Sequence, residues 1–394
     1  MKKELIGTKF VHCGRDRKRS ADFVNIPPYR GSTVLFDSVD DMFAREDRKA
    51  RGECEMTYGT DGGPTHQALF NAFCELEGGY RSWAYCTGLA GCVVPILAMV
   101  GCGDHILMTD SVYGPVRAFC EKTLSRFGVE VEFYDPLIAG GIESLFRANT
   151  KLVYMESPGT HSFEMQDVPA IAEAARRHGI RTMIDNTWAT PLYFRPMEHG
   201  VDIVVHALTK YVGGHSDILM AIVTCNEATW PQIWDTSNQL GQLVGADDAY
   251  LALRGLRTLK PRLEYQSRSA REVIAWLKEQ SLIERIHWPA DESDPGHSIW
   301  KRDFSGASSL FAITFKEEVS DEQIRAFASS LKIFGRGYSW GGFESLVCLS
   351  YGKRECSSNF NMQKSVRIAI GLEDTEDLIE DLKTGFEAML RTPL

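Results

Sequence analysis

The chain has 394 residues, of which 44% are apolar and 24% charged, and its formal net charge is −10. This negative balance disfavours non-specific binding to nucleic acid, so we expect no nucleic-acid partner. The longest apolar stretch, near residues 93–100, is interrupted by Pro95 and is too short to cross a bilayer. The start, MKKELIGTKF, has no apolar run typical of a signal peptide. We therefore expect a cytoplasmic protein without membrane contact.

The cysteine pattern fits the same compartment. None of the ten cysteines forms a C-x-x-C pair, and many lie in apolar runs. Cysteines of this kind are typical of reduced thiols that pack as small hydrophobic groups, rather than of disulfides or a zinc site.

The first 62 residues show little periodicity and many polar or aromatic positions. This pattern predicts an N-terminal arm that lies on something other than its own core.

Residues 63–257 alternate between strand-like and helix-like segments. Apolar runs occur at residues 104–110, 129–136, 151–158, 180–188, 202–210 and 217–225. Helix-like segments, each closed by a glycine, occupy residues 116–128 and 168–179. The alternation predicts an α/β domain, a mostly parallel sheet with helices on both faces.

Residues 258–394 change in character. Helical patterns cover residues 263–280 and 376–390, and a strand-like run at 308–315 lies between them. We expect a smaller α+β C-terminal domain here.

Three polar residues, Glu156, Asp185 and Lys210, fall at the ends of apolar strands. In parallel sheets functional residues gather at the carboxyl ends of strands, so a shared site is predicted. A lysine whose amine is desolvated becomes a nucleophile that forms Schiff bases with carbonyls. The alternative for Lys210 is a surface lysine with a buried stem.

The neighbouring residues suit pyridoxal phosphate (PLP). An acid such as Asp185 keeps the pyridine nitrogen of that cofactor protonated. Gly88 in CTGLAG begins a helix-like run whose free N–H groups suit a phosphate. Tyr113 is placed to stack on a ring, and Arg367 to grip a substrate carboxylate. Taken singly, these are also ordinary residues: a helix cap, a glycine before a helix, a core tyrosine and a strand-edge arginine.

Five ordered motifs carry a family resemblance: the stretch around Lys210, IDNTW, MESPG, YSWGGFESL and VRIAIGLED. Together they resemble the Cys/Met-metabolism family of PLP enzymes over nearly the whole chain. MESPG followed by threonine and histidine, together with Tyr338, Ser339 and Trp340, is similar to the branch that cleaves the carbon–sulfur bond of cystathionine by β-elimination. The resemblance implies an aspartate-aminotransferase-like (fold type I) enzyme. It also implies a homotetramer, a dimer of dimers with active sites shared across each dimer.

The roles of the family's site residues can be assigned to the residues of this chain that occupy the same motif positions. The resemblance implies that Lys210 holds the cofactor and moves protons, and that Asp185 pairs with the pyridine nitrogen. It also implies a catalytic role for Tyr113, which stacks on the ring and tunes the incoming amine. The implied phosphate ligands are Gly88, Leu89, Thr209 and, from the neighbouring subunit, Tyr58. On the substrate side, the resemblance implies Ser339, Arg367, Tyr338 and Trp340.

The stretch YGTDGG departs from the family pattern. Thr60 stands where the family carries an arginine that contacts the phosphate across the interface. Its hydroxyl can still hydrogen-bond the phosphate, but one positive charge is missing, and Arg117 is a candidate to compensate. Asp61 stands where related β-lyases often carry a second arginine, for the distal carboxylate of cystathionine. An acid lining the distal pocket would favour a cationic group, and so the alternative substrate is a γ-substituted amino acid such as canavanine, cleaved by a γ-lyase. The other interpretation of Asp61 is a turn residue that faces solvent.

The sequence partly matches the sites of two other enzyme classes. Residues 337–341 match the G-x-S-x-G nucleophile elbow of serine hydrolases, but no histidine follows Ser339 as that fold requires. His206, His215 and Asp217 have the chemistry of zinc ligands, although their spacing matches no helix pair and a lysine lies among them. We expect no metal.

Overall fold

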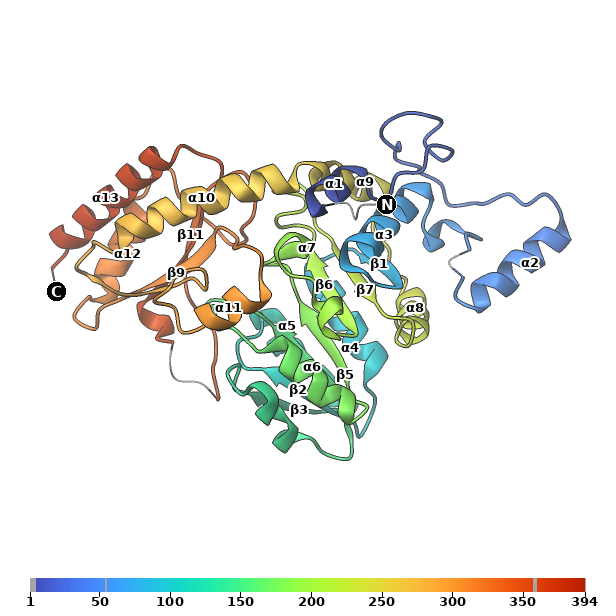
Figure 1. Ribbon diagram of the computed structural model, residues 1–394, viewed down its shortest axis with the longest axis horizontal. Coiled ribbons are helices and arrows are strands. Elements are labelled where there is room, and N and C mark those ends of the chain that lie inside the picture. The colour runs from blue at the N-terminus through green and yellow to red at the C-terminus, as the bar shows by residue number, and fades with distance from the viewer. Residues whose placement is uncertain (1–4, 54, 357–359, 394) are drawn as a thin grey trace.

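The computed structural model describes residues 5–53, 55–356 and 360–393 (Figure 1). Within these ranges, every helix is too short or too polar to traverse a lipid bilayer. The nine cysteines described form no disulfide with one another, and Cys54 lies outside the described residues.

The predicted arm divides into two parts. Helix α1 (Ile6–His12) packs on α3 (Pro64–Glu77), α9 (Ala246–Arg257) and α10 (Leu259–Leu277), and it buries Phe10 in the core of its own chain. Helix α2 (Val39–Ala50) buries no side chain and stands away from the rest of the chain in Figure 1. The expectation of an arm therefore fails for the first helix, where apolar side chains find partners within the chain.

A seven-stranded sheet forms the centre of the larger part. Its strands are β1 (Arg81–Tyr85), β2 (His105–Thr109), β3 (Glu130–Tyr134), β4 (Thr150–Glu156), β5 (Arg181–Asp185), β6 (Ile203–Ala207) and β7 (Ala221–Cys225). The order is β1-β7-β6-β5-β4-β2-β3, and only β7 runs antiparallel to its neighbours. Five of the six predicted runs contain one of these strands, and the run 151–158 overlaps β4, which begins one residue earlier. The family fold, a mostly parallel sheet covered by helices, is present.

Both faces of this sheet are buried. Along β4, Leu152 and Tyr154 belong to one hydrophobic cluster, whereas Val153 and Met155 belong to the other. This alternation follows from the two-residue period of a strand. The helices of the larger part are α3, α4 (Gly88–Met99), α5 (Gly114–Lys122), α6 (Val168–Arg177), α7 (Thr190–Tyr193), α8 (Trp230–Gln239) and α9.

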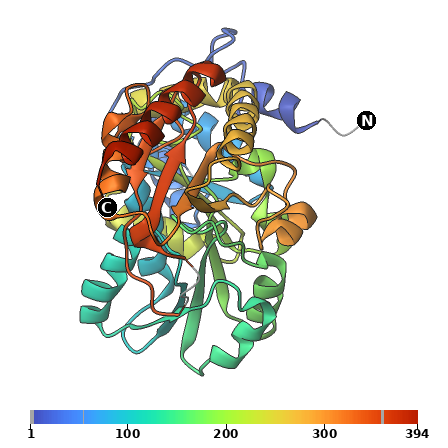
Figure 2. The same ribbon diagram turned by 90° about the vertical axis from the view of Figure 1, so that its left-hand side faces the viewer.

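A second sheet, orange to red in Figure 2, follows α10 in the chain. Its strand order is β10-β11-β12-β9-β8. Its strands are β8 (Ile283–His287), β9 (Leu310–Phe315), β10 (Gly335–Arg336), β11 (Leu346–Leu349) and β12 (Ser365–Ala369). Its helices are α11 (His297–Asp303), α12 (Asp321–Ser330) and α13 (Thr375–Arg391). The expected boundary at 257/258 falls between α9 and α10, and the proposed domain limits stay a prediction.

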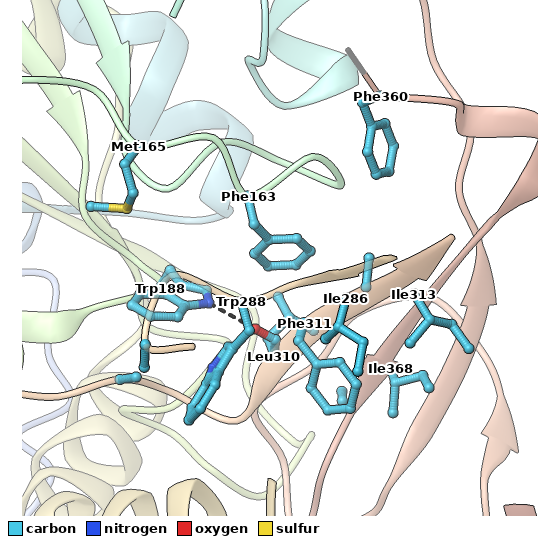
Figure 3. Close-up of a cluster of buried hydrophobic side chains, with 14 of the residues drawn as sticks. Phe163, Met165, Trp188, Ile286, Trp288, Leu310, Phe311, Ile313, Phe360 and Ile368 are labelled. Carbon is cyan, nitrogen blue, oxygen red and sulfur yellow. Dashed lines mark hydrogen bonds between the residues drawn. The ribbon is translucent and has the colours of Figure 1, made fainter. Parts of the chain in front are cut away.

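The two sheets share one hydrophobic cluster (Figure 3). Phe163 and Trp188, from loops after β4 and β5, lie beside Leu310 and Phe311 of β9. The Trp188 indole Nε1 donates a hydrogen bond to the Leu310 carbonyl at 3.0 Å. This packing fixes the second sheet against the strand ends of the first.

Arg262 of α10 ties the segment after β6 to that helix. Its buried guanidinium donates to the carbonyl oxygens of Tyr211 (2.8 Å), Val212 (3.2 Å) and Gly255 (2.9 Å).

Arg262→Met should lower the free energy of unfolding by about 3 kcal/mol or more, because buried acceptors lose their donor. Denaturant unfolding measures this, with Arg268→Met, exposed on the same helix, as the control. Equal stability of the two variants would contradict the prediction.

Candidate active site

A cavity of about 280 Å³ lies at the carboxyl ends of β4, β5 and β6, where the second sheet meets the first. Glu156, Asp185 and Lys210 all line it, as the strand ends predicted. The other predicted residues that line the same cavity are Gly88, Leu89, Tyr113, Thr209, Tyr338, Ser339, Trp340 and Arg367.

Lys210 lies three residues beyond the end of β6, in a turn rather than in the strand itself. Its Nζ donates to Ser339 Oγ at 2.6 Å and lies 5.3 Å from the centre of the Trp340 ring. Burial, together with the charge of Arg367, lowers the pKa of Lys210 to about 8, although Asp185 opposes this shift. The amine is therefore available as a base and nucleophile near neutral pH.

Asp185 is the last residue of β5, and both of its carboxylate oxygens are held. Oδ1 accepts from the Thr187 backbone N–H at 2.9 Å and from the Thr187 hydroxyl at 2.5 Å. Oδ2 accepts a long bond from Cys92 Sγ at 3.8 Å. The Thr187 hydroxyl also accepts from the Ala207 N–H at 2.9 Å, and so one side chain connects the acid to the strand that precedes Lys210.

Glu156 is the register neighbour of Asp185, one strand away. Its buried carboxylate accepts from the Tyr113 backbone N–H at 2.8 Å and from the Thr160 hydroxyl. Burial and the charge of Asp185 raise the pKa of Glu156 well above its usual range. Glu156 therefore fixes Tyr113 at the cavity wall.

The raised pKa of Glu156 predicts a pH-dependent stability of the cofactor-free protein. The unfolded state releases this proton near pH 4.3, whereas the folded state retains it to higher pH. The folded state then binds more protons, so the free energy of unfolding should fall as the pH rises above about 4.3. Glu156→Gln cannot ionise and should weaken this fall, as measured by denaturant unfolding at several pH values. An unchanged slope would contradict the prediction.

The helix α4 begins at one end of the cavity. Thr87 caps it by accepting from the Ala90 N–H at 3.0 Å. The N–H groups of Gly88 and Leu89 lie in the first turn, where a helix offers no internal acceptor. A Cβ on Gly88 would lie 3.2 Å from the Ala207 Cβ, so the backbone approaches β6 closely. Thr209 lies at the same cavity. Such a helix start is suited to a phosphate.

The opposite end contains Ser339 and Arg367. Arg367, on β12, donates to the Ser339 carbonyl at 3.2 Å, and burial lowers the pKa of its guanidinium. Ser339 has a φ of 80°, a conformation that costs energy for a residue with a Cβ. This backbone directs the Ser339 hydroxyl toward Lys210. Tyr338 and Trp340, on either side, complete the wall.

Several lining residues were not identified from the sequence: Cys92, Thr160, Thr187, His161 and Tyr351. Thr160 and His161 directly follow the MESPG motif, which was the available signal. No motif in the sequence marks Cys92 or Tyr351 as a site residue. Their positions at the cavity follow only from the tertiary structure.

Tyr58, Thr60 and Asp61 do not line the cavity of their own chain. Tyr58 and Thr60 are exposed side chains beside the short helix η1 (Gly59–Asp61). The role predicted for them is in a neighbouring subunit's site, and it stays a prediction.

The carboxylate of Asp61 is occupied. Oδ2 accepts from the Thr57 N–H, the Thr57 hydroxyl and the Tyr58 N–H, each at 2.9 Å, and Oδ1 lies 2.8 Å from Lys49 Nζ. Asp61 is 5% exposed, and so it is not a solvent-facing turn residue either. The structure does not support a free acid that binds a cationic substrate group, because this acid organises its own loop.

Arg117 is also occupied. Its guanidinium donates to the Asp110 carboxylate and, at 3.4 Å, to Glu121, and it lies over the Phe133 ring. Arg117 does not line the cavity. It is therefore not placed to replace the missing family arginine within its own chain.

No metal-binding cluster of histidine, cysteine and acidic residues occurs in the described part of the chain. His206 pairs with the buried Glu77 at 2.5 Å, and His215 Nδ1 contacts the Gly213 carbonyl at 2.7 Å. Both histidines of the zinc alternative thus have partners within the chain.

The residues fit PLP. The cavity offers an amine with a lowered pKa, an acid held by a threonine, and a helix start with free N–H groups. These are the groups needed for an aldehyde, a pyridine nitrogen and a phosphate.

The chain belongs to the family of Cys/Met metabolism PLP-dependent enzymes, whose model matches residues 7–387. A protein of Rhizobium johnstonii, named provisionally as a cystathionine β-lyase, is 46% identical over 387 residues, which is 97% of this chain and 96% of the relative. The cystathionine β-lyase of Haemophilus influenzae is 39% identical and covers 97% of this chain and 98% of its own. The crystal structure of metB from Corynebacterium glutamicum matches with a TM-score of 0.88 and 25% identity, covering 98% of both chains.

None of these names supports the canavanine alternative. With Asp61 bound inside its own loop, that alternative is set aside.

Proposed function

We propose that the protein is a carbon–sulfur lyase that eliminates a thiol from Cβ of a sulfur amino acid such as cystathionine. The observation that carries this proposal is the position of the Lys210 amine. It donates to Ser339 in the cavity that Glu156, Asp185 and Arg367 also line, and its pKa is about 8. The names of the relatives support the same chemistry.

In this mechanism Arg367 and Ser339 bind the α-carboxylate and orient Cα. Lys210 removes the Cα proton, and PLP, when bound, stores the electron pair that remains. The Cβ–S bond then breaks, and the sulfur leaves as a thiol after protonation. Hydrolysis of the remaining fragment gives pyruvate and ammonia.

Other residues hold the cofactor. Gly88, Leu89 and Thr209 would bind its phosphate, and Asp185 would pair with its pyridine nitrogen. The Glu156 carboxylate, bonded to the Tyr113 backbone, places the tyrosine ring at one wall.

Product analysis tests the reaction. Purified enzyme loaded with PLP is incubated with L-cystathionine, and the products are identified. β-Elimination gives homocysteine, pyruvate and ammonia, whereas cleavage at Cγ gives cysteine, 2-oxobutyrate and ammonia. Formation of 2-oxobutyrate as the main keto acid would overturn the proposed position of cleavage.

We also propose a cytoplasmic homotetramer in which the arm completes a neighbouring subunit's site. The arm exposes large apolar side chains, including Phe23 (75%), Val24 (71%), Leu35 (87%) and Phe43 (60%). Monomers rarely leave so much apolar surface uncovered. The lack of disulfides among the described cysteines is in keeping with a reducing compartment.

Subunit mixing tests the shared site. Tyr58→Phe and Lys210→Ala should each be poorly active alone. After dissociation and reassociation in equal amounts, about a quarter of all sites should combine an intact lysine with an intact tyrosine, because dimers are symmetric. Recovery of activity supports the proposal. No recovery despite mixed dimers, or full activity in a demonstrated monomer, would contradict it.

A further inference from the structure

Three aromatic rings form one wall of the cavity. The His161 ring, from the loop after β4, meets the Tyr351 ring edge-on with centres 5.0 Å apart. Tyr351, just after β11, in turn meets Tyr338 edge-on at 5.9 Å. All three line the cavity that contains Lys210. The catalytic roles proposed above use neither His161 nor Tyr351.

His161 is uncharged and has unused hydrogen-bonding capacity. It is 5% exposed, and its ring forms no hydrogen bond with the described residues. Burial, together with the charge of Arg367, lowers the pKa of His161 to about 3, so the ring is neutral at physiological pH. Its φ of 63° is unusual for a residue with a Cβ. The loop therefore maintains a strained backbone that presents a neutral ring at the cavity.

Tyr351 is held although half of it is exposed. The residues that follow it are fixed on Asp110, whose buried carboxylate accepts from the Glu355 and Cys356 N–H groups and from Arg354 Nε, each at 3.0 Å. Arg354 also donates to Glu164 at 2.7 Å. These bonds limit the movement of Tyr351 away from His161.

Among the described residues, the cavity lining has no cation beyond Lys210 and Arg367. The charged residues that line the cavity are Glu156, Asp185, Lys210 and Arg367. The two cations among them are engaged at the α-carbon side in the proposed reaction. Arg117 and Arg354, nearby, are paired with Asp110.

In the described part of the arm, positions 49, 60 and 61 carry no unpaired cation. Thr60 replaces the family arginine, and Lys49 is paired with Asp61 at 2.8 Å. A carboxylate at the distal end of a substrate would therefore lose water without gaining a charged partner, which is costly.

We propose that His161 and Tyr351, with Tyr338 beside them, form an uncharged aromatic subsite for the sulfur substituent of the substrate. The enzyme then favours cysteine thioethers with an apolar substituent over those whose substituent ends in a carboxylate. This inference rests on the proposed carbon–sulfur lyase activity. Sulfur makes favourable contacts with aromatic ring edges, and an apolar substituent gains from leaving water.

A matched substrate pair tests the preference. S-(3-Methylbutyl)-L-cysteine and S-(2-carboxyethyl)-L-cysteine have nearly the same shape, but only the second carries a distal carboxylate. Holoenzyme should turn over the methylbutyl compound with a kcat/KM about tenfold or more above that of the carboxyethyl compound. An equal or reversed ratio would overturn the inference.

Variants locate the preference. Tyr351→Arg should shift the ratio about tenfold or more toward the carboxyethyl compound by supplying the missing cation. Leu390→Arg, exposed on α13, adds the same charge elsewhere and should leave the ratio unchanged. His161→Leu should raise KM for the methylbutyl compound more than it lowers kcat. A ratio that does not respond to Tyr351→Arg would also overturn the inference.

The same assay distinguishes a failure of the proposed lyase activity from a failure of the proposed subsite. If holoenzyme forms no pyruvate from either compound or from cystathionine, the proposed lyase activity fails, and the subsite with it. If pyruvate forms but the carboxylate-bearing substrates are favoured, only the subsite fails.

Discussion

Replacing Lys210 by alanine should abolish turnover, the largest effect expected for a single substitution. The amine is the base that lies beside Ser339, and its pKa of about 8 allows it to take and return protons near neutral pH. Loss of a positioned proton carrier alone costs about 10²–10⁴-fold in rate. Loss of the covalent attachment of PLP adds to this.

The attachment itself is measured separately from activity. Borohydride treatment of the holoenzyme should fix the cofactor on Lys210 and remove the near-visible absorption band. Lys260→Ala, which removes an exposed lysine paired with Glu264, serves as the control and should keep both activity and absorption. Fixation at any other lysine would end the assignment of Lys210.

Asp185→Asn should retain bound cofactor but lose most activity. The neutral amide cannot hold a proton on the pyridine nitrogen, so negative charge that develops at Cα is less stabilised. Loss of one preorganised electrostatic group typically costs about 10²–10³-fold in kcat. Steady-state kinetics, together with the absorption spectrum of the bound cofactor, measure both parts.

The control must separate charge from structure. Asp185 also accepts two bonds from Thr187, and the amide oxygen of asparagine can still accept them. Thermal unfolding of the Asp185→Asn variant should therefore change little. Asp321→Asn, at an exposed position on α12, controls for the loss of one charge. Wild-type turnover by Asp185→Asn would assign the aspartate a structural role only.

The core of the site was predictable because polar residues leave apolar strands at one sheet edge. Glu156, Asp185 and Lys210 follow this rule, and the structure brings them into one cavity. The apolar runs were equally informative about the parallel strands. β1 was missed because its sequence, RSWAY, is short and does not alternate strictly.

The roles of the other candidate residues depend on side chains that are distant in the sequence. Asp61 has the same local sequence whether it is a turn residue, a substrate ligand or a buried acceptor. Its contact with Lys49 on α2 decides the matter. The sequence around Arg117 likewise gives no sign that its guanidinium donates to Asp110 and Glu121. Local sequence patterns identify charged residues that are candidates for binding a ligand. Only the fold shows which of these residues already pair with another residue of the chain.

The contact between Lys210 and Ser339 spans 129 residues of chain, and the loop of Gly341 lies directly on the Tyr211 backbone. The carboxylate-binding end of the cavity is thus supplied by residues that the ribosome adds long after the lysine. A nascent chain that has folded its first sheet already contains the amine, the acid and the helix start, yet it has no means of orienting an amino acid. The full lining of the cavity is therefore present only after Arg367, near the end of the chain, has been synthesised.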